Sequence, residues 1–253
     1  MYSYGIIQWV LFFYIYCFLG WIWETCYVSI RKRHFVNRGF LHGPSLPLYG
    51  SGAILVLLVT IPVRQNLLLV YVLGMVFATA LEYVTGMVME RMFHVRYWDY
   101  SNKPFNLNGH ICLLCSLAWG IFAIIMIKII HRPIETLVLL LSVEFVNLLV
   151  IIVTIIMAID MTQSFNEAMN LKELLSKLTS HNVDLIKLQK HLDYVTSKLG
   201  EIPKEWEEFK KSRSYLQSVR LLRRNPDAIS SHYSEALREI KKIIKKRKEK
   251  VRD

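Results

Sequence analysis

IIQWVLFFYIYCFLGWIWETCYVSI, residues Ile6–Ile30, holds one charged side chain, Glu24. A helix of about 20 residues is long enough to cross the hydrocarbon core of a membrane. Because a segment in lipid must satisfy its own backbone hydrogen bonds, and this run lacks the alternation of barrel strands, we expect a helix. No basic residue precedes the run and no small-residue cleavage signal follows it, so we predict a retained membrane helix and not a secretory signal peptide.

Four more apolar runs follow the first one before Asp160. They are Leu46–Val63, Leu67–Met89, Ile111–Ile130 and Ile134–Ile159. The whole chain is 53% hydrophobic and has a mean hydropathy of +0.32, which is unusual for a soluble protein. We therefore expect an all-α, polytopic membrane protein with five transmembrane helices.

Basic residues set the expected orientation. The loop after the first run carries a basic cluster made of Arg31, Lys32, Arg33 and Arg38. By the positive-inside rule this loop is cytoplasmic, and five spans then put the N-terminus outside and the C-terminus in the cytoplasm. The loop that contains Arg91, Arg96 and Lys103 falls on the same side as the basic tail, in agreement with this orientation.

The composition changes after Asp160 from apolar to charged, which divides the chain into a transmembrane domain, residues 1–160, and a cytosolic helical domain, residues 161–253. A long helix is expected over 161–199, because nine positions there alternate in spacing between three and four, as in a coiled coil. These positions are Leu171, Leu174, Leu178, His181, Leu185, Leu188, Leu192, Val195 and Leu199.

Two shorter helices are expected at about 203–224 and 226–252, because Gly200 can end one helix while Pro203 and Pro226 can start the next. Two arrangements remain open for the apolar stripes of this domain. The helices can fold back on one another as an antiparallel bundle, or the seam Leu171–Leu199 can pair with a second copy in a homodimer.

The C-terminal stretch KKIIKKRKEKVR, Lys241–Arg252, is strongly basic. Beside a membrane it is suited to attract anionic lipid head groups. It can also be a solvated helix end that the helix dipole favours. We expect no nucleic-acid partner, since no recognised binding motif accompanies the charge.

Carboxylates inside membrane helices are costly unless they face a polar interior, so they are candidates for function. Glu24 lies in the first run, Glu82 in the third with Glu90 two turns later, and Glu144 in the fifth. Helical spacing puts each of them on a stripe with other polar or small residues, and we expect these stripes to face inward. The alternative is that the acids only form ion pairs with Arg38, Arg91 or backbone amides.

The stretch RGFLHGPSLPLYGSGA, Arg38–Ala53, contains prolines and glycines that delay the second helix. Irregular backbone at that depth needs protein or water around it. We expect Arg38 and His42 to meet an anionic group there.

The stretch WDYSNKPFNLNGHICLLC, Trp98–Cys115, is expected to be a cytoplasmic connection between the third and fourth spans. Asp99, Asn106 and Asn108 are expected to fix this loop by capping helix ends and binding backbone donors. A closed zinc site needs about four ligands, and the chain has no second Cys-x-x-Cys or His pair, so we expect no metal and no cofactor. The chain also lacks a GxxxxGK(S/T) loop for ATP hydrolysis.

Four motifs resemble the bacterial CmpB-like family of ABC-transporter type IV permeases. They are FLGWIWETCYVSI, FVNRGFLHGPSLPLYGSGA, TALEYVTGMVMERMF and WDYSNKPFNLNGHICLLCSLAWG, and the similarity covers most of residues 16–125. The resemblance implies a multi-pass protein of the bacterial plasma membrane that depends on a separate ATPase subunit. It also singles out Trp98, Tyr100 and Trp119, whereas His110 stands where the family usually has arginine.

The leading hypothesis is a permease-like transport subunit with a polar interior that opens to the cytoplasm between the second and fourth spans. The candidate binding residues are Glu24, Arg38, His42, Glu82, Glu90, Asp99, Asn106, Asn108 and Glu144, and no catalytic residue is assigned. One alternative is a membrane enzyme acting on lipid or isoprenoid head groups, which needs two of His42, Glu82, Glu90 and Asp99 in one pocket. The other is a membrane-anchored coiled-coil scaffold or sensor.

Overall fold

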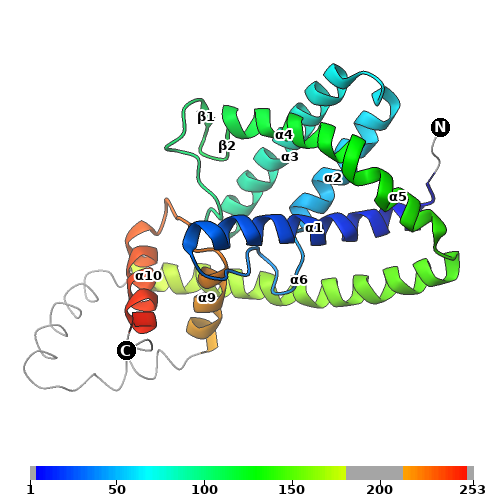
Figure 1. Ribbon diagram of the computed structural model, residues 1–253. Helices are drawn as coiled ribbons and strands as arrows, with labels where there is room; N and C mark the ends of the chain where they lie inside the picture. Colours follow the sequence, from blue (N-terminus) through cyan, green and yellow to red (C-terminus); the bar gives the residue numbers. More distant parts are fainter. Residues whose placement is uncertain (1–3, 181–212, 250–253) are drawn as a thin grey trace, which may run out of the picture. The chain divides into compact units, whose positions relative to one another are not determined.

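The computed structural model describes residues 4–180 and 213–249. The chain forms two compact units. The first unit contains Met1–Val88 and Trp98–Thr162, and the second contains Met89–Tyr97 and Gln163–Asp253. Figure 1 labels the α-helices and the two strands of the described part. The elements follow in the order α1 (Ile6–Lys32), α2 (Pro47–Thr60), η1 (Ile61–Val63), α3 (Leu67–Phe93), β1 (Asn106–Leu107), β2 (Ile111–Cys112), α4 (Leu113–Ile125), η2 (Met126–Ile130), α5 (His131–Leu140), α6 (Val143–Ser180), α9 (Arg213–Arg224) and α10 (Ser234–Glu249).

Four helical segments of the described part are long and apolar enough to cross a membrane. They are Ile6–Lys32, Leu67–Phe93, Leu113–Leu140 and Val143–Thr179, while the apolar segment Pro47–Val63 is shorter. The structure thus supports a mostly helical, multi-pass membrane protein, but a fifth span is not shown. The side of the membrane on which each terminus lies stays a prediction from the basic residues.

The predicted boundary between the last two apolar runs is wrong. One apolar run was expected to end at Ile130 and the next to begin at Ile134, yet α4, η2 and α5 follow one another without a break from Leu113 to Leu140, through Pro133. The π-helical turn η2 ends just before α5. Its wider backbone accommodates the ring of Pro133, which would clash with the preceding turn of a regular α-helix. The chain turns instead at Leu141, which is extended with φ −76° and ψ 144°.

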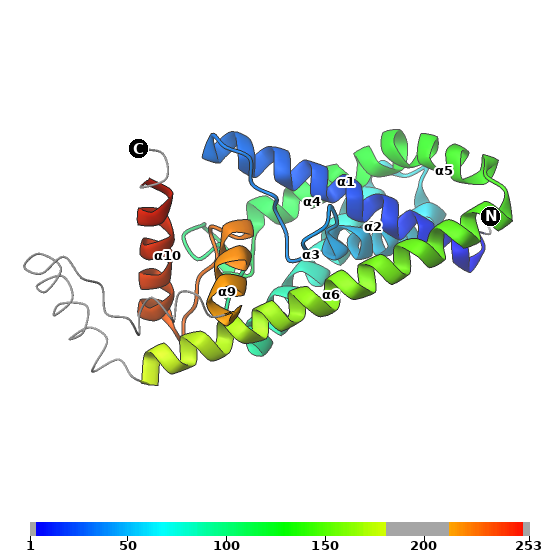
Figure 2. The same ribbon diagram turned by 90° about the horizontal axis from the view of Figure 1, so that it is seen from below.

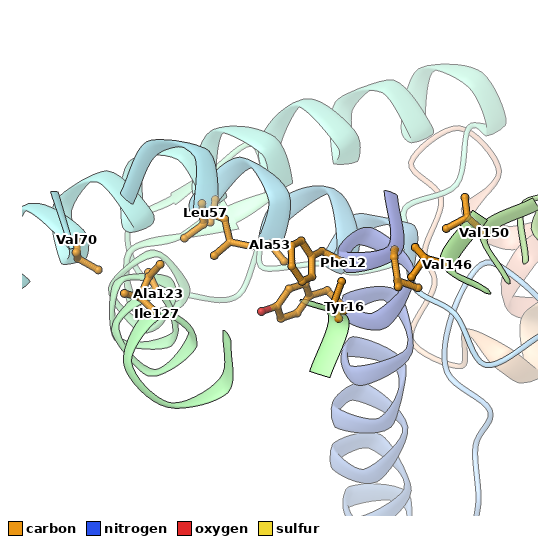
Figure 3. Packing of buried hydrophobic residues seen from close by; sticks show 13 residues of the cluster. Phe12, Tyr16, Ala53, Leu57, Val70, Ala123, Ile127, Val146 and Val150 are labelled. Atoms are coloured by element: carbon orange, nitrogen blue, oxygen red, sulfur yellow. The ribbon is translucent and has the colours of Figure 1, made fainter. Parts of the chain in front are cut away.

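The core of the first unit is built from apolar side chains that the six helices α1 to α6 and the turn η2 direct toward one another. Figure 3 shows Phe12 and Tyr16 of α1 among residues of α2, α4 and α6. The labelled members are Phe12, Tyr16, Ala53, Leu57, Val70, Ala123, Ile127, Val146 and Val150. Many other large apolar side chains, such as Leu68 and Ile156, are exposed, as expected where a bundle faces lipid.

Helices α1 and α2 approach each other at two glycines. A Cβ atom at Gly20 would lie 2.3 Å from Cβ of Tyr49, and one at Gly50 would lie 2.3 Å from Sγ of Cys17. Small residues allow such close approach between membrane helices. The contact fixes Tyr49 against α1, next to the site described below.

The loop after α3 closes with a short hairpin. Strands β1 and β2 pair antiparallel, with Asn106 opposite Cys112. Asn108 and Gly109 have φ values of 52° and 73° in the turn between them. They are the central residues of a β-turn that the His110 N–H closes by donating to the Leu107 carbonyl at 3.1 Å, and Asn-Gly is a usual pair where both central residues need positive φ.

The second unit packs the C-terminal part of α6 with α9 and α10. Leu171 and Leu174 are buried in this unit, and the Asn170 side chain donates to Gln217 of α9 at 2.7 Å. Figure 2 shows α9 beside α6. This part of the seam is thus covered within the chain, while residues 181–199 lie outside the described residues. A coiled coil and a homodimer through Leu171–Leu199 stay predictions.

The last helix begins later than expected. Helix α10 starts at Ser234 and not at Pro226, because the residues between them serve other contacts. Ile229 and Arg96 pair their backbones in both directions, at 2.8 and 2.9 Å. The Ser230 hydroxyl accepts the backbone N–H of Tyr233 at 3.0 Å. The anionic-lipid contact of Lys241–Arg252 stays a prediction.

Candidate functional site

Glu82 of α3 is the most buried carboxylate among the candidate residues of the first unit, with 6% of its surface exposed. Its Oε2 accepts a hydrogen bond from Trp119 Nε1 of α4 at 2.8 Å, and its Oε1 accepts one from the Tyr100 hydroxyl at 3.2 Å. Both donors are neutral. Among the described residues, no basic side chain pairs with Glu82.

Glu24 of α1 lies in a different environment. Its Oε1 accepts a hydrogen bond from the Tyr49 hydroxyl at 2.7 Å, and its Oε2 lies 3.8 Å from Arg38 Nε. Arg38 therefore balances the charge of Glu24, whereas no basic side chain of the described residues pairs with Glu82. We call Glu24, Arg38, Tyr49, Glu82, Tyr100 and Trp119 the glutamate cluster.

A cavity of about 420 Å³ borders the glutamate cluster through Glu82, Tyr49 and Trp119. Its lining comes from α1, α2, α3, α4 and η2 and is otherwise mainly apolar. Four lining residues are also exposed on the outside of the unit: Ile22, Trp23, Phe122 and Ile130. The cavity therefore runs from an apolar, exposed surface inward to a buried carboxylate.

The loop after α3 holds Tyr100 in place. The Tyr100 backbone N–H donates to the Gly109 carbonyl at 2.9 Å, and Asn106 Oδ1 accepts the Gly109 N–H at 3.1 Å. Asp99 accepts the Ser101 backbone N–H at 3.1 Å. Burial and the nearby Glu82 raise the pKa of Tyr100, so its hydroxyl stays protonated and remains a donor to the carboxylate.

Three candidate residues thus act on the loop and do not line the cavity. Asp99 and Asn106 bind within the loop, and Asn108 Nδ2 donates to the Tyr83 hydroxyl of α3 at 3.0 Å. They hold the backbone that presents Tyr100 to Glu82. The sequence predicted these three residues on the loop, but it did not predict that they position Tyr100.

Asp160 of α6 is a functional candidate that sequence reasoning missed. Its Oδ1 accepts the backbone N–H of His42 at 2.9 Å and lies 2.8 Å from the His42 Nδ1, while its Oδ2 accepts the Gly43 N–H at 2.8 Å. The anionic group that meets His42 is therefore a side chain of the same protein. The available signal was a lone acid at the end of an apolar run.

We predict that Asp160→Ala destabilises the first unit by about 2–3 kcal/mol, because it leaves the amides of His42 and Gly43 without their acceptor. His42→Ala keeps both backbone bonds and is expected to cost about 1 kcal/mol. Melting of the purified protein in detergent should show a drop of roughly 5–10 °C for Asp160→Ala and a clearly smaller one for His42→Ala. Equal shifts would mean that the imidazole, and not the carboxylate clamp on the backbone, carries the contact.

Two predicted site residues lie elsewhere. Glu90 belongs to the second unit, where its Oε2 is 2.7 Å from Arg96 Nε and its Oε1 accepts from the Ser231 hydroxyl. Glu144 was expected well inside the last span, but it lies in the first turn of α6 and is exposed. The reason is the displaced helix boundary, which moves the start of the last long helix to Val143.

The cysteines of the loop form a close pair. Cys112 Sγ lies 3.1 Å from Cys115 Sγ, and both thiols are free. The His110 ring packs on Gly86 of α3. Over residues 4–180 and 213–249, no group of three or more His, Cys, Asp and Glu side chains is placed to hold a metal ion.

A second cavity, of about 440 Å³, lies in the first unit near η2. Its charged lining residues are Arg64, Lys128, Arg132 and Glu135. The Tyr4 hydroxyl donates to Glu135 at 2.5 Å, and the buried His131 bonds to Tyr16 at 2.9 Å. This cavity has basic groups but shares no lining residue with the glutamate cluster.

Comparison with known protein families gives a match that covers the site. A family model described as Putative ABC-transporter type IV matches residues 11–165. The match includes the whole glutamate cluster and Asp160. No curated protein and no solved structure gives a significant match.

Proposed function

The chain belongs to the Putative ABC-transporter type IV family, and from this premise we propose that it is a permease-like subunit that a separate ATPase chain drives. The separate chain is needed because this sequence has no GxxxxGK(S/T) loop of its own. The four spanning-length helices support a role within the bilayer.

The observation that carries the proposal is Glu82 at the inner end of the cavity. A carboxylate buried in a membrane bundle is costly, and such groups mark substrate or ion paths. Here the carboxylate is reached from an apolar surface through a cavity of suitable size for a small ligand. A purely structural acid would be expected to resemble Glu24, which pairs with Arg38.

An enzymatic role on lipid head groups has less support. It required at least two of His42, Glu82, Glu90 and Asp99 to reach one pocket. Glu82 lines the cavity, whereas His42 is bonded to Asp160, and Asp99 is bonded to Ser101. A general acid–base pair around a single reacting group is not assembled by these four residues.

Purification of the tagged full chain from its native membranes tests the proposal. With mild detergent and brief crosslinking, we expect a P-loop ATPase chain to co-purify in a fixed ratio. A tagged, unrelated multi-pass protein from the same membranes serves as the control for abundant contaminants. Recovery of the chain with no ATPase under either condition would count against a driven transporter and in favour of a self-sufficient membrane protein.

A further inference from the structure

We infer that the cavity beside Glu82 binds a membrane-dissolved amphiphile with an organic ammonium head and an apolar body. The inference rests on the proposed function only in taking this cavity as the substrate site. It assigns Glu82 as the counter-ion of the head group and the apolar walls as the place of the body.

The charge of the site comes first. Glu82 receives hydrogen bonds from Trp119 and Tyr100, which are neutral donors. In the described residues it has no cationic partner, although it is almost fully buried. A buried carboxylate strongly favours an opposite charge close by. Because each carboxylate oxygen can accept more than one hydrogen bond, Glu82 can also accept donors from a ligand.

Aromatic rings next to Glu82 give the second reason. Tyr49 and Trp119 meet with ring centroids 5.7 Å apart, and Trp119 and Phe122 with centroids 5.9 Å apart. Phe122 in turn meets Trp23 at 5.4 Å. All four rings line the cavity. Faces of Trp, Tyr and Phe attract organic cations, and aromatic groups are a common way to bind alkylated ammonium.

The apolar lining of the cavity indicates that the rest of the ligand is apolar. Apart from Glu82 and the hydroxyl-bearing tyrosines, the lining consists of apolar, small and aromatic residues from Leu19 of α1 to Ile130 of η2. The volume of about 420 Å³ falls in the usual range for small-molecule sites. Exposed apolar residues at the edge, such as Trp23, give an alkyl chain a way in from the bilayer.

Other cations fit less well. Mg²⁺ and Ca²⁺ require about six or more oxygen ligands, and this cavity offers one carboxylate with few further oxygens. An anion would meet Glu82 without compensation. A proton on Glu82 would neutralise the site by itself, and it is therefore the outcome that the experiment must separate from ammonium binding.

The test uses the full chain in nanodiscs and radiolabelled hexadecyltrimethylammonium as the probe. We expect saturable binding to the wild type, and Glu82→Gln should weaken it at least about tenfold by removing the counter-ion. Glutamine keeps a carbonyl acceptor for Trp119 or Tyr100, so size-exclusion profiles and melting should stay close to the wild type. Glu144→Gln is the matched control, and we expect it to change the affinity by less than about twofold because Glu144 is exposed in the first turn of α6 and does not line the cavity.

Hexadecanol, which has the same chain and no charge, provides the second control. It should compete weakly, and equally, in the wild type and in Glu82→Gln. Equal affinity of both proteins for the ammonium probe would overturn the inference and indicate a protonated Glu82. Co-purification of an ATPase together with that result would leave the transport role standing without this substrate class. Glu82-dependent binding without any ATPase would keep the ammonium site and remove the transport role.

Discussion

Glu167→Ala is expected to destabilise the second unit by about 3–5 kcal/mol, the usual cost of breaking a buried ion pair from one side. Glu167 Oε2 of α6 lies 2.6 Å from Arg224 Nη2 of α9, and the two side chains are 4% and 8% exposed. Removing the carboxylate takes away the 2.6 Å ion-pair partner of a buried guanidinium. Hydrogen exchange of the α9 amides should therefore speed up between about a hundredfold and a few thousandfold.

Glu173→Ala on the same helix is the matched control. Its ion pair with Lys177 is 2.6 Å long but exposed, and such pairs four residues apart contribute only about 0.3–0.5 kcal/mol. The double variant Glu167→Leu with Arg224→Met removes both charges together and should recover much of the lost protection. Similar exchange in Glu167→Ala and Glu173→Ala would show that the buried pair does not hold α9 on α6.

The helices were predictable because span length is a strong local signal. The runs Ile6–Ile30 and Leu67–Met89 correspond closely to α1 and α3. The failure around Pro133 has a local cause that propensity does not capture. A proline usually interrupts a helix, but the π-helical turn η2 just before it absorbs the conflict. The same error displaced Glu144 from a predicted interior to an exposed first turn.

The acids of the site were found because burying a carboxylate in a membrane is costly, and that rule applies to single residues. Their partners were not found in this way. Trp119 is far from Glu82 along the chain, and the hydrogen bond between them depends on how α3 packs against α4. Periodicity within one helix carries no information about such a pair. The family resemblance did single out Tyr100 and Trp119, but without their contact to Glu82.

Asp160 shows the same limit from the other direction. Its position at the end of an apolar run marked a domain boundary in the sequence. The same position did not indicate that its carboxylate accepts hydrogen bonds from a distant turn. Its role appears only when the turn His42–Gly43 directs two backbone N–H groups toward α6. Such backbone donors are present in every residue, so the sequence does not distinguish the turn that presents them together.

Gly50→Ala is expected to destabilise the contact between α1 and α2 by about 3 kcal/mol, at the upper end of the usual cost of overpacking. The new Cβ would lie 2.3 Å from Cys17 Sγ and 2.7 Å from the Phe13 carbonyl oxygen. The thiol can rotate away, but a helix carbonyl cannot move without shifting α1. Melting in detergent should fall by roughly 6–12 °C.

Gly20→Ala should act on the site as well as on stability. Its Cβ would lie 2.3 Å from Cβ of Tyr49, so Tyr49 must move away from α1 and lose its 2.7 Å hydrogen bond to Glu24. Gly52→Ala is the matched control on α2, because its Cβ meets only Leu81 Cδ2 at an ordinary 3.7 Å. At this position the better helix propensity of alanine should stabilise α2 by up to about 1 kcal/mol. The melting temperature should therefore stay unchanged or rise slightly. If all three alanine variants melted alike, helix propensity and not close approach would explain these glycines, and the position of Tyr49 beside the cavity would need another cause.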